Sequence, residues 1–233
     1  MNDKASHDDL IRAIQKLLSE SFHGLLSTHS VKFPGYPFGS LLPICLDSKG
    51  NPHILISHLA QHTQNLDANP HCSLMLYETG QEDVQQLARL TCLAKAEPIH
   101  SPSVAERYFR YYPESRRYHK ELNFIFYRLT IEQFYFIGGF GSARWFDVSR
   151  ITPPTPLSAA DESELLYQLN THKQAPLKHY LSQQGVSTTA ASIEAIGANL
   201  LGVDVRLDHH LQHIHFQQPL SDVRDFIQQL DQA

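Results

Sequence analysis

A short polar segment between two apolar runs holds the residues with the clearest capacity for ligand chemistry. The runs ILIS and CSLMLYE are typical of buried strands, and the segment between them carries Ser57, His62, Thr63 and Asn65. If a strand ends at Ser57 and a short helix follows, the free N–H groups at the helix start form a site for an anion such as phosphate. The alternative is that these side chains only cap the helix and form its turn, and composition by itself favours this alternative.

The histidines form a second group with ligand chemistry. The chain has fifteen of them, and His213 and His215 alternate along an expected strand, where His209 or His210 could supply a third metal ligand. A solvent-exposed hairpin face is the favoured alternative, because neither HExxH nor CxxC accompanies them. The three cysteines all lie in apolar runs, so we expect buried, reduced thiols without disulfides or metal.

The elements that must position these groups are one helix and a dense series of strands. The segment DDLIRAIQKLLSE places its leucines and isoleucines on one face, which predicts an amphipathic N-terminal helix. A tight turn is expected at Gly50 in DSKGN. The strand candidates that follow the helix are FHGLLST, GSLLPICLD, HILIS, CSLMLYE, ARLTCLAKAEPI, NFIFYRLT and EQFYFIGGF. Their density predicts an α+β chain whose first domain, residues 1–148, is an antiparallel barrel.

Prolines divide the chain after this barrel. Three of them between residues 153 and 156 predict a linker over residues 149–160 and a small C-terminal α/β domain over residues 161–233. That domain is expected to hold helices, a hairpin turning near Asp208 and a last helix opened by Ser221. No run approaches the ~20 apolar residues of a membrane span, and the N-terminus is acidic, so we expect a cytoplasmic protein without a membrane partner.

One helical segment between the strands mixes basic and aromatic residues. RYFRYYPESRRYHK, residues 107–120, could contact single-stranded nucleic acid through its arginines and tyrosines. The favoured interpretation is a helix that packs its aromatic rings on the barrel and exposes its arginines to solvent, since the chain carries a net charge of −5. We therefore expect no nucleic-acid partner. A small anion, or the carboxylates of a porphyrin, would suit the same basic residues.

The order of these motifs resembles the flavin-binding split-barrel family related to pyridoxamine 5'-phosphate oxidase. More narrowly, it is similar to the haem-utilisation (HugZ/HutZ-type) branch with a small C-terminal α/β domain. The stretches that carry the resemblance are PFGSLLPICLDSKGNPHILIS, HLAQHTQNLDANPHCSLML, ARLTCLAKAEPI and FYRLTIEQFYFIGGFGSARW. The resemblance implies a split β-barrel, FMN as cofactor, and a homodimer in which a second subunit completes the pocket. The cofactor-binding residues that it implies are Ser40, Ser57, His62, Thr63, Asn65, Arg89 and Trp145.

Two departures from the family pattern leave three functions open. The pattern HTRNL becomes HTQNL, so Gln64 replaces a phosphate-pairing arginine, and MNxDH becomes LNTHK. No hydrolytic constellation can be assembled from the sequence, so a cofactor would have to carry the chemistry. The first hypothesis is an FMN-dependent oxidoreductase. The second is a haem-binding or haem-degrading protein with His172, His179 or His213 on the iron, and the third is a non-catalytic ligand-binding protein that has lost flavin.

Overall fold

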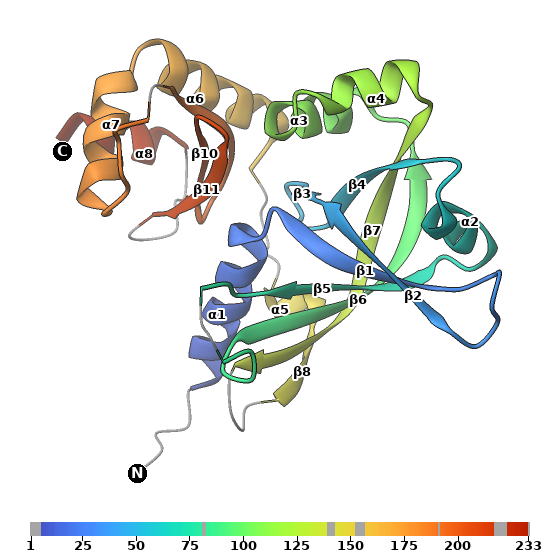
Figure 1. Ribbon diagram of the computed structural model, residues 1–233. Coiled ribbons are helices and arrows are strands. Elements are labelled where there is room, and N and C mark those ends of the chain that lie inside the picture. Colours follow the sequence, from blue (N-terminus) through green and yellow to red (C-terminus); the bar gives the residue numbers. More distant parts are fainter. Residues whose placement is uncertain are drawn as a thin grey trace. The chain divides into compact units, whose positions relative to one another are not determined.

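The chain forms two compact units in this computed structural model, which describes residues 6–80, 83–138, 143–151, 157–190, 192–216 and 223–232 (Figure 1). Unit 1 comprises the described residues of Met1–Ala105 and Glu114–Pro154. Unit 2 comprises those of Glu106–Pro113 and Thr155–Ala233. The segment Glu106–Pro113 therefore belongs with the C-terminal part of the chain. The three prolines expected to form the linker all lie outside the described residues, and the linker stays a prediction.

Unit 1 is an antiparallel sheet that curls into a half-barrel, which confirms the predicted fold class. Its sheet has the strand order β2-β1-β5-β6-β7-β4-β3, with β8 paired to β7. The elements assigned to this part of the chain are α1 (His7–Glu20), β1 (His23–His29), β2 (Pro37–Pro43), β3 (Cys45–Leu46), β4 (Pro52–Ser57), α2 (Gln61–Ala68), β5 (His71–Tyr77), β6 (Ala88–Ile99), α3 (Pro102–Tyr111), α4 (Ser115–Glu121), β7 (Phe124–Gly138), β8 (Ala143–Asp147) and α5 (Val148–Ile151).

The N-terminal helix α1 forms as its sequence predicts and covers the inner face of the sheet. Ser6 and Asp9 make a capping box, in which each side chain accepts from the backbone N–H of the other. Leu10, Ile14 and Leu17 are buried and belong to the barrel core. The helix contacts β5, β6 and β7. Helical spacing of the apolar residues was therefore sufficient to predict both the helix and its buried face.

Two long strands give the half-barrel its shape. β6 and β7 pair along the whole length of β6, and a β-bulge at Leu93 and Ala94 bends the ladder. Side chains alternate between an inner, buried face and an outer, more exposed face, as in β5, where Cys72, Leu74 and Leu76 are buried. The turn before β4 carries Gly50 at φ 82°, the positive value that the sequence predicted.

Unit 2 packs helices on a small sheet of order β11-β10-β9. Its elements are α6 (Ala159–Thr171), α7 (Gln174–Gln183), β9 (Ile193–Asn199), β10 (Gly202–Leu207), β11 (His210–His215) and α8 (Val223–Gln232). The hairpin turns at Asp208, which has φ 54°, as predicted, whereas β9 was not anticipated. Ser221, the expected helix cap, lies outside the described residues. Among the helices that are described in either unit, none is long and apolar enough to cross a membrane.

Candidate functional site

Helix α2 is fastened to three different strands by polar side chains. His62 Nδ1 and Ser40 Oγ of β2 are joined by a hydrogen bond of 3.1 Å. The Thr63 hydroxyl donates to the carbonyl oxygen of Ser57, at the end of β4, over 2.6 Å. The Asn65 side chain reaches β1, as described below. An eight-residue helix is only marginally stable in isolation, so these bonds to the neighbouring strands stabilise α2 and fix its position.

Asn65 is the most thoroughly bonded of the three side chains and is 0% exposed. Its amide nitrogen donates to Thr28 Oγ1 over 2.9 Å. Its amide oxygen accepts from the backbone N–H of Val31 over 3.0 Å and from Gln61 Nε2 over 3.1 Å. Asn65 therefore ties α2 to strand β1 and to the β1–β2 loop.

The residues predicted to cradle a phosphate thus use their polar atoms inside the protein. Ser57 Oγ accepts from the N–H of Leu59 over 3.2 Å, and the hydroxyl of Thr63 and the amide of Asn65 are engaged as described above. Helix α2 begins after Ala60, which supplies no side-chain cap. Gln64, where the family pattern has arginine, is exposed and directs Nε2 to the Leu59 carbonyl over 3.4 Å. The three side chains predicted to surround an anion at the helix start are therefore all hydrogen-bonded to protein atoms.

His62 lies inside this framework and favours its neutral form. Burial lowers the pKa of its imidazole, because a charged ring would lose hydration. Its Nε2 atom is buried and has no hydrogen-bond partner among the described residues. His62 is therefore a structural neighbour of Ser40 in this chain, and its unpartnered nitrogen faces protein atoms, not solvent.

Arg89 and Trp145 lie far from α2 along the sheet. Ser57 pairs with Phe124 at one end of β7, whereas Arg89 pairs with Ile137 near the other end. Thirteen residues of strand separate those two positions, roughly 40 Å of chain at about 3.3 Å per residue. Figure 1 shows α2 and β8, which carries Trp145, at opposite ends of the barrel. Within one chain, these two groups of residues lie toward different ends of β7, and the cofactor site that the resemblance implies stays a prediction.

The three histidines considered for haem iron all lie in unit 2. His172 ends α6 and its ring contacts Tyr167 edge-on at 5.7 Å. His179 is exposed on α7, with Nε2 3.0 Å from Gln183 Nε2. His213 is different, because its side chain is 0% exposed and offers no accessible nitrogen to a porphyrin. The expectation that His213 lies on a solvent-exposed hairpin face is wrong.

His213 belongs to a buried hydrogen-bonded group in unit 2. Its Nδ1 atom lies 2.6 Å from Asp204 Oδ1, and the Tyr111 hydroxyl donates to the other carboxylate oxygen. Burial would raise the pKa of Asp204, but His213, Tyr111 and a nearby arginine together hold that pKa below its usual range. Gly202 makes room for the ring, since a Cβ there would meet His213 Nε2 at 2.4 Å.

Arginines from α3 complete this network. Arg107 pairs with Glu162 Oε1, and Arg110 Nη2 lies 3.2 Å from Glu162 Oε2. Arg110 also donates through Nε to the carbonyl oxygen of Ile196 over 2.8 Å. The prediction that α3 exposes its arginines to solvent is therefore wrong for this pair, because carboxylates distant in the sequence bind them. The network fixes residues 106–113 within unit 2.

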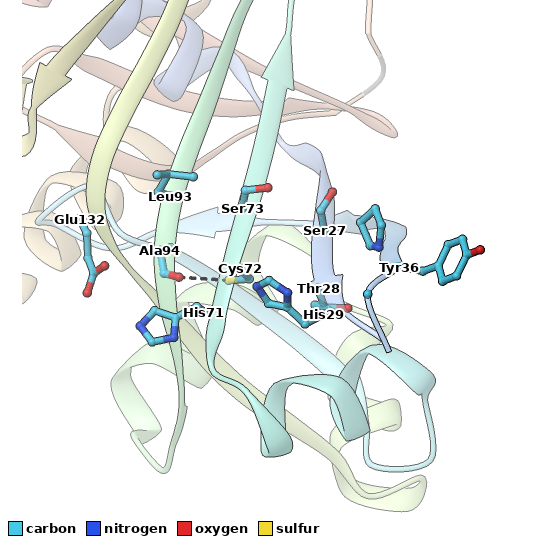
Figure 2. A pocket seen from close by; sticks show the side chains of 12 residues that line it. Ser27, Thr28, His29, Tyr36, His71, Cys72, Ser73, Leu93, Ala94 and Glu132 are labelled. Carbon is cyan, nitrogen blue, oxygen red and sulfur yellow. Dashed lines mark hydrogen bonds between the residues drawn. The ribbon is translucent and has the colours of Figure 1, made fainter. Parts of the chain in front are cut away.

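The outer face of the barrel carries a pocket that the sequence analysis did not identify. We name it the barrel pocket; its volume is about 460 Å³ (Figure 2). Strands β1, β5, β6 and β7 and the β1–β2 loop form its walls. The lining residues are Ser27, Thr28, His29, Gly35, Tyr36, Pro37, His71, Cys72, Ser73, Leu93, Ala94 and Glu132. The volume falls in the range of about 300 to 1,000 Å³ that is usual for small-molecule sites.

Two exposed imidazoles mark the barrel pocket. Ser27 pairs with Ser73 across β1 and β5, and the exposed His29 and His71 each lie two residues from this pair, on β1 and β5 respectively. His71 Nδ1 lies 3.1 Å from the side-chain oxygen of Asn69. The local signal in the sequence was the motif NPHC directly after a helix, which places a side-chain acceptor two residues before a histidine.

The thiol in the barrel pocket stays protonated. Burial, with a smaller contribution from the negative charge of Glu132, raises the pKa of Cys72 to about 12. The sulfur lies 3.5 Å from the carbonyl oxygen of Ala94, to which the thiol donates. Because the thiolate is the metal-binding form of cysteine, Cys72 is a poor ligand at neutral pH.

Comparison with known proteins agrees with this fold. The family model described as CREG, beta-barrel, matches residues 6–151. The heme oxygenase HutZ of Vibrio cholerae is 32% identical over 126 residues, which cover 51% of this chain and 71% of that protein. The chloroplastic non-canonical heme oxygenase HOZ of Arabidopsis thaliana is 42% identical over 74 residues, 32% of this chain. That match spans only 23% of HOZ.

A solved structure resembles the chain over nearly its whole length. The protein Atu2129 of Agrobacterium tumefaciens, of unknown function, has a TM-score of 0.80 at 22% identity and covers 98% of this chain and 96% of its own. The family-model match and the HutZ match confirm the resemblance to the haem-utilisation branch of the FMN-binding split-barrel fold. The structure of Atu2129 agrees with the fold.

Proposed function

This chain belongs to the CREG-type β-barrel family. We propose that it binds haem, that it acts in haem utilisation, and that its haem site includes the barrel pocket. The observation that carries the proposal is a contrast within unit 1. The side chains expected to hold a flavin phosphate are engaged inside the protein, whereas the barrel pocket presents two exposed imidazoles. Histidine is the commonest protein ligand of haem iron.

The residues of the barrel pocket fit the chemistry of a porphyrin. His29 and His71 offer imidazole nitrogens, and the exposed Leu93 offers apolar surface to a flat ring. Ser27 and Ser73 stand opposite each other and present hydroxyls that can donate to carboxylates (Figure 2). Haem, when bound, supplies a redox-active iron, while the protein binds it, orients it and controls its access to water. We propose no acid or base residue for a reaction.

A second copy of the chain is the partner we propose for the outer face. One row of side chains crosses six strands in continuous register, and two of its members are strongly exposed: Leu41 is 65% exposed and Trp145 is 56% exposed. The complete row is Leu41, Leu25, Met75, Thr91, Tyr135 and Trp145. Apolar burial against an identical face would form a symmetric dimer, the commonest soluble oligomer.

FMN remains the competing cofactor because the fold accommodates it in the family that the chain resembles. In this hypothesis Ser40, Ser57, His62, Thr63 and Asn65 lie at one end of the flavin site. Arg89 and Trp145 would come from the other end of the sheet, so the site would need a second subunit to complete it. Gln64→Arg tests this hypothesis directly. A guanidinium beside the start of α2 should raise FMN affinity more than tenfold if a phosphate binds there.

The deciding experiment is a pair of titrations, one with ferric haem and one with FMN. The expected result is one haem per chain, reported by an intense porphyrin absorption band, with weak FMN binding by fluorescence quenching. His29→Ala with His71→Ala should weaken haem binding, while His172→Ala with His179→Ala should leave it unchanged. If only the double variant His172→Ala with His179→Ala lost haem binding, the haem site would lie in unit 2. Tight FMN binding without haem binding would overturn the proposal.

A further inference from the structure

The imidazole of His71 is held in one orientation by Asn69. The Asn69 side-chain oxygen lies 3.1 Å from His71 Nδ1 and accepts the backbone N–H of the same residue over 3.0 Å. The backbone donor identifies this atom as the amide oxygen. An amide oxygen only accepts hydrogen bonds, so Nδ1 is the donor, and the neutral form of the ring then carries its lone pair on Nε2.

Asn69 is itself fixed at the end of α2. It is the C-cap residue, with φ −145° and ψ 109°, and its N–H donates to the carbonyl oxygen of Asn65 over 2.9 Å. The next residue, Pro70, disfavours a helical conformation at Asn69 and accepts the N–H of Ala96 over 2.8 Å. The bonds that fasten α2 to the strands therefore also set the position of the His71 ring.

His71 Nε2 is the atom left for a ligand. Among the residues that the structure describes, it makes no hydrogen bond, and the side chain is exposed at the barrel pocket (Figure 2). Metal-binding histidines almost always donate the other ring N–H to a carbonyl or carboxylate oxygen, which fixes the tautomer and makes the free nitrogen a better ligand. The Asn69–His71 pair has this arrangement.

The other possible iron ligands in the barrel pocket are not oriented by a hydrogen bond in this way. His29 has no hydrogen-bonded partner among the described residues to select its tautomer or orientation. Cys72 keeps its proton, as shown above, and Tyr36 projects away from the lining strands in Figure 2.

We propose that His71 is the residue that binds haem iron through Nε2 and that Asn69 is its positioning residue. The inference rests on the proposed haem function. The Nε2 lone pair forms the bond to iron while Nδ1 keeps its proton and its bond to Asn69, so no proton or electron is transferred in the step. The remainder of the barrel pocket contacts the porphyrin ring and its carboxylates.

The test compares wild type, His71→Gly and the matched control His100→Gly, which removes an exposed imidazole of unit 1 that does not line the barrel pocket. Ferric haem is titrated into each protein, and the complexes are compared by absorption and electron paramagnetic resonance spectra. We expect His71→Gly to change both spectra and to lose at least tenfold in affinity. Added imidazole should restore the wild-type spectra, since it fills the vacant space and supplies the nitrogen. His100→Gly should keep the wild-type spectra and affinity.

Two Asn69 variants test its positioning role. Asn69→Ala should weaken haem binding about tenfold, because losing an orienting partner typically costs 10- to 100-fold in metal affinity. Asn69→Asp keeps the acceptor and should retain affinity. In the haem-free protein, nitrogen NMR should show His71 protonated on Nδ1, and Asn69→Ala should shift this population.

The outcomes separate the two proposals. A wild-type protein that binds no haem overturns the proposed function and this inference with it. Stoichiometric haem binding with unchanged spectra in His71→Gly overturns only the assignment of His71. A His71 ring protonated on Nε2 in the haem-free wild type would overturn the role given to Asn69, whatever cofactor is bound.

Discussion

Replacement of Asn65 by alanine is the sharpest test of what α2 does in this protein. The substitution removes three hydrogen bonds, to Thr28 Oγ1, the N–H of Val31 and Gln61 Nε2, from a residue with no solvent exposure. Each such bond contributes about 1 kcal/mol net, so Asn65→Ala should lower the free energy of unfolding of unit 1 by about 3 kcal/mol. Buried groups left unsatisfied would add to that cost.

A matched control separates the bond between Gln61 and Asn65 from the other two bonds of Asn65. Gln61→Ala removes only the bond between the Gln61 and Asn65 side chains, so it should cost about 1 kcal/mol. The difference of about 2 kcal/mol is then assigned to the attachment of α2 to β1 and to the β1–β2 loop. The double variant Asn65→Ala with Thr28→Val should cost less than the sum of the two single changes, because the partners share a bond.

The assay is urea unfolding followed by tryptophan fluorescence. The chain has one tryptophan, Trp145, which lies on β8 of the barrel, so the signal reports unit 1. With a slope of about 2 to 3 kcal/mol per molar urea, 3 kcal/mol corresponds to a midpoint shift of about 1 to 1.5 M. A midpoint for Asn65→Ala no lower than that of Gln61→Ala would refute the anchoring role. Unchanged stability with lost FMN binding would favour a phosphate ligand instead.

Three further predictions concern other parts of the molecule. Asp204→Asn should destabilise unit 2 by about 3 to 6 kcal/mol, because it removes the charged acceptor of two buried hydrogen bonds, from Tyr111 and His213, that contribute about 1.5 to 3 kcal/mol each. Hydrogen exchange in β9 and β10 should report this loss. The pKa of Asp204 is lowered in the folded state, so its charge stabilises unit 2 above a pH of about 4, and this stabilisation is lost as the pH falls through the folded-state pKa. If wild type stayed more stable than Asp204→Asn in strong acid, this prediction would be contradicted. Cys72, with its pKa raised to about 12, should be only about 10⁻⁴ thiolate at pH 8 and resist iodoacetamide until the protein is unfolded, so rapid native alkylation would refute its burial. Limited proteolysis should cut first within residues 152–156. The two fragments should stay associated in gel filtration, because the α3 arginines on one fragment bind Glu162 on the other. Immediate separation of the fragments would contradict that network.

The histidines show that the sequence did not predict which strand face is buried. His213 and His71 both lie on short strands among alternating polar and apolar residues, so their local patterns are alike. The packing of unit 2 buries the first against Gly202 and Asp204, while the second faces solvent beside Asn69. Burial of a strand face depends on which elements cover it, and those elements come from distant parts of the sequence.

Helix α3 shows the same limit for charges. Its alternation of arginine and tyrosine correctly predicted a helix, but the net charge of the chain said nothing about where individual carboxylates lie. Glu162 lies 55 residues from Arg107 and Asp204 lies 93 residues from Tyr111, so no local rule could pair them. Only the folded chain brings those groups within bonding distance.

The sequence by itself determined the elements and their buried faces, because short-range periodicity decides which side of a helix or strand is apolar. It predicted α1, the turn at Gly50, the hairpin at Asp208 and most strands of the half-barrel. The separate candidates NFIFYRLT and EQFYFIGGF, however, form the single strand β7, and β8 was not among the candidates. The tertiary structure alone decided the partners of each polar side chain. It directed Thr63 and Asn65 inward to Ser57 and Thr28, and it left the imidazole of His71 facing a pocket. The physical reason is that a hydrogen bond depends on distance and direction in space, which register and packing set across strands far apart in the chain.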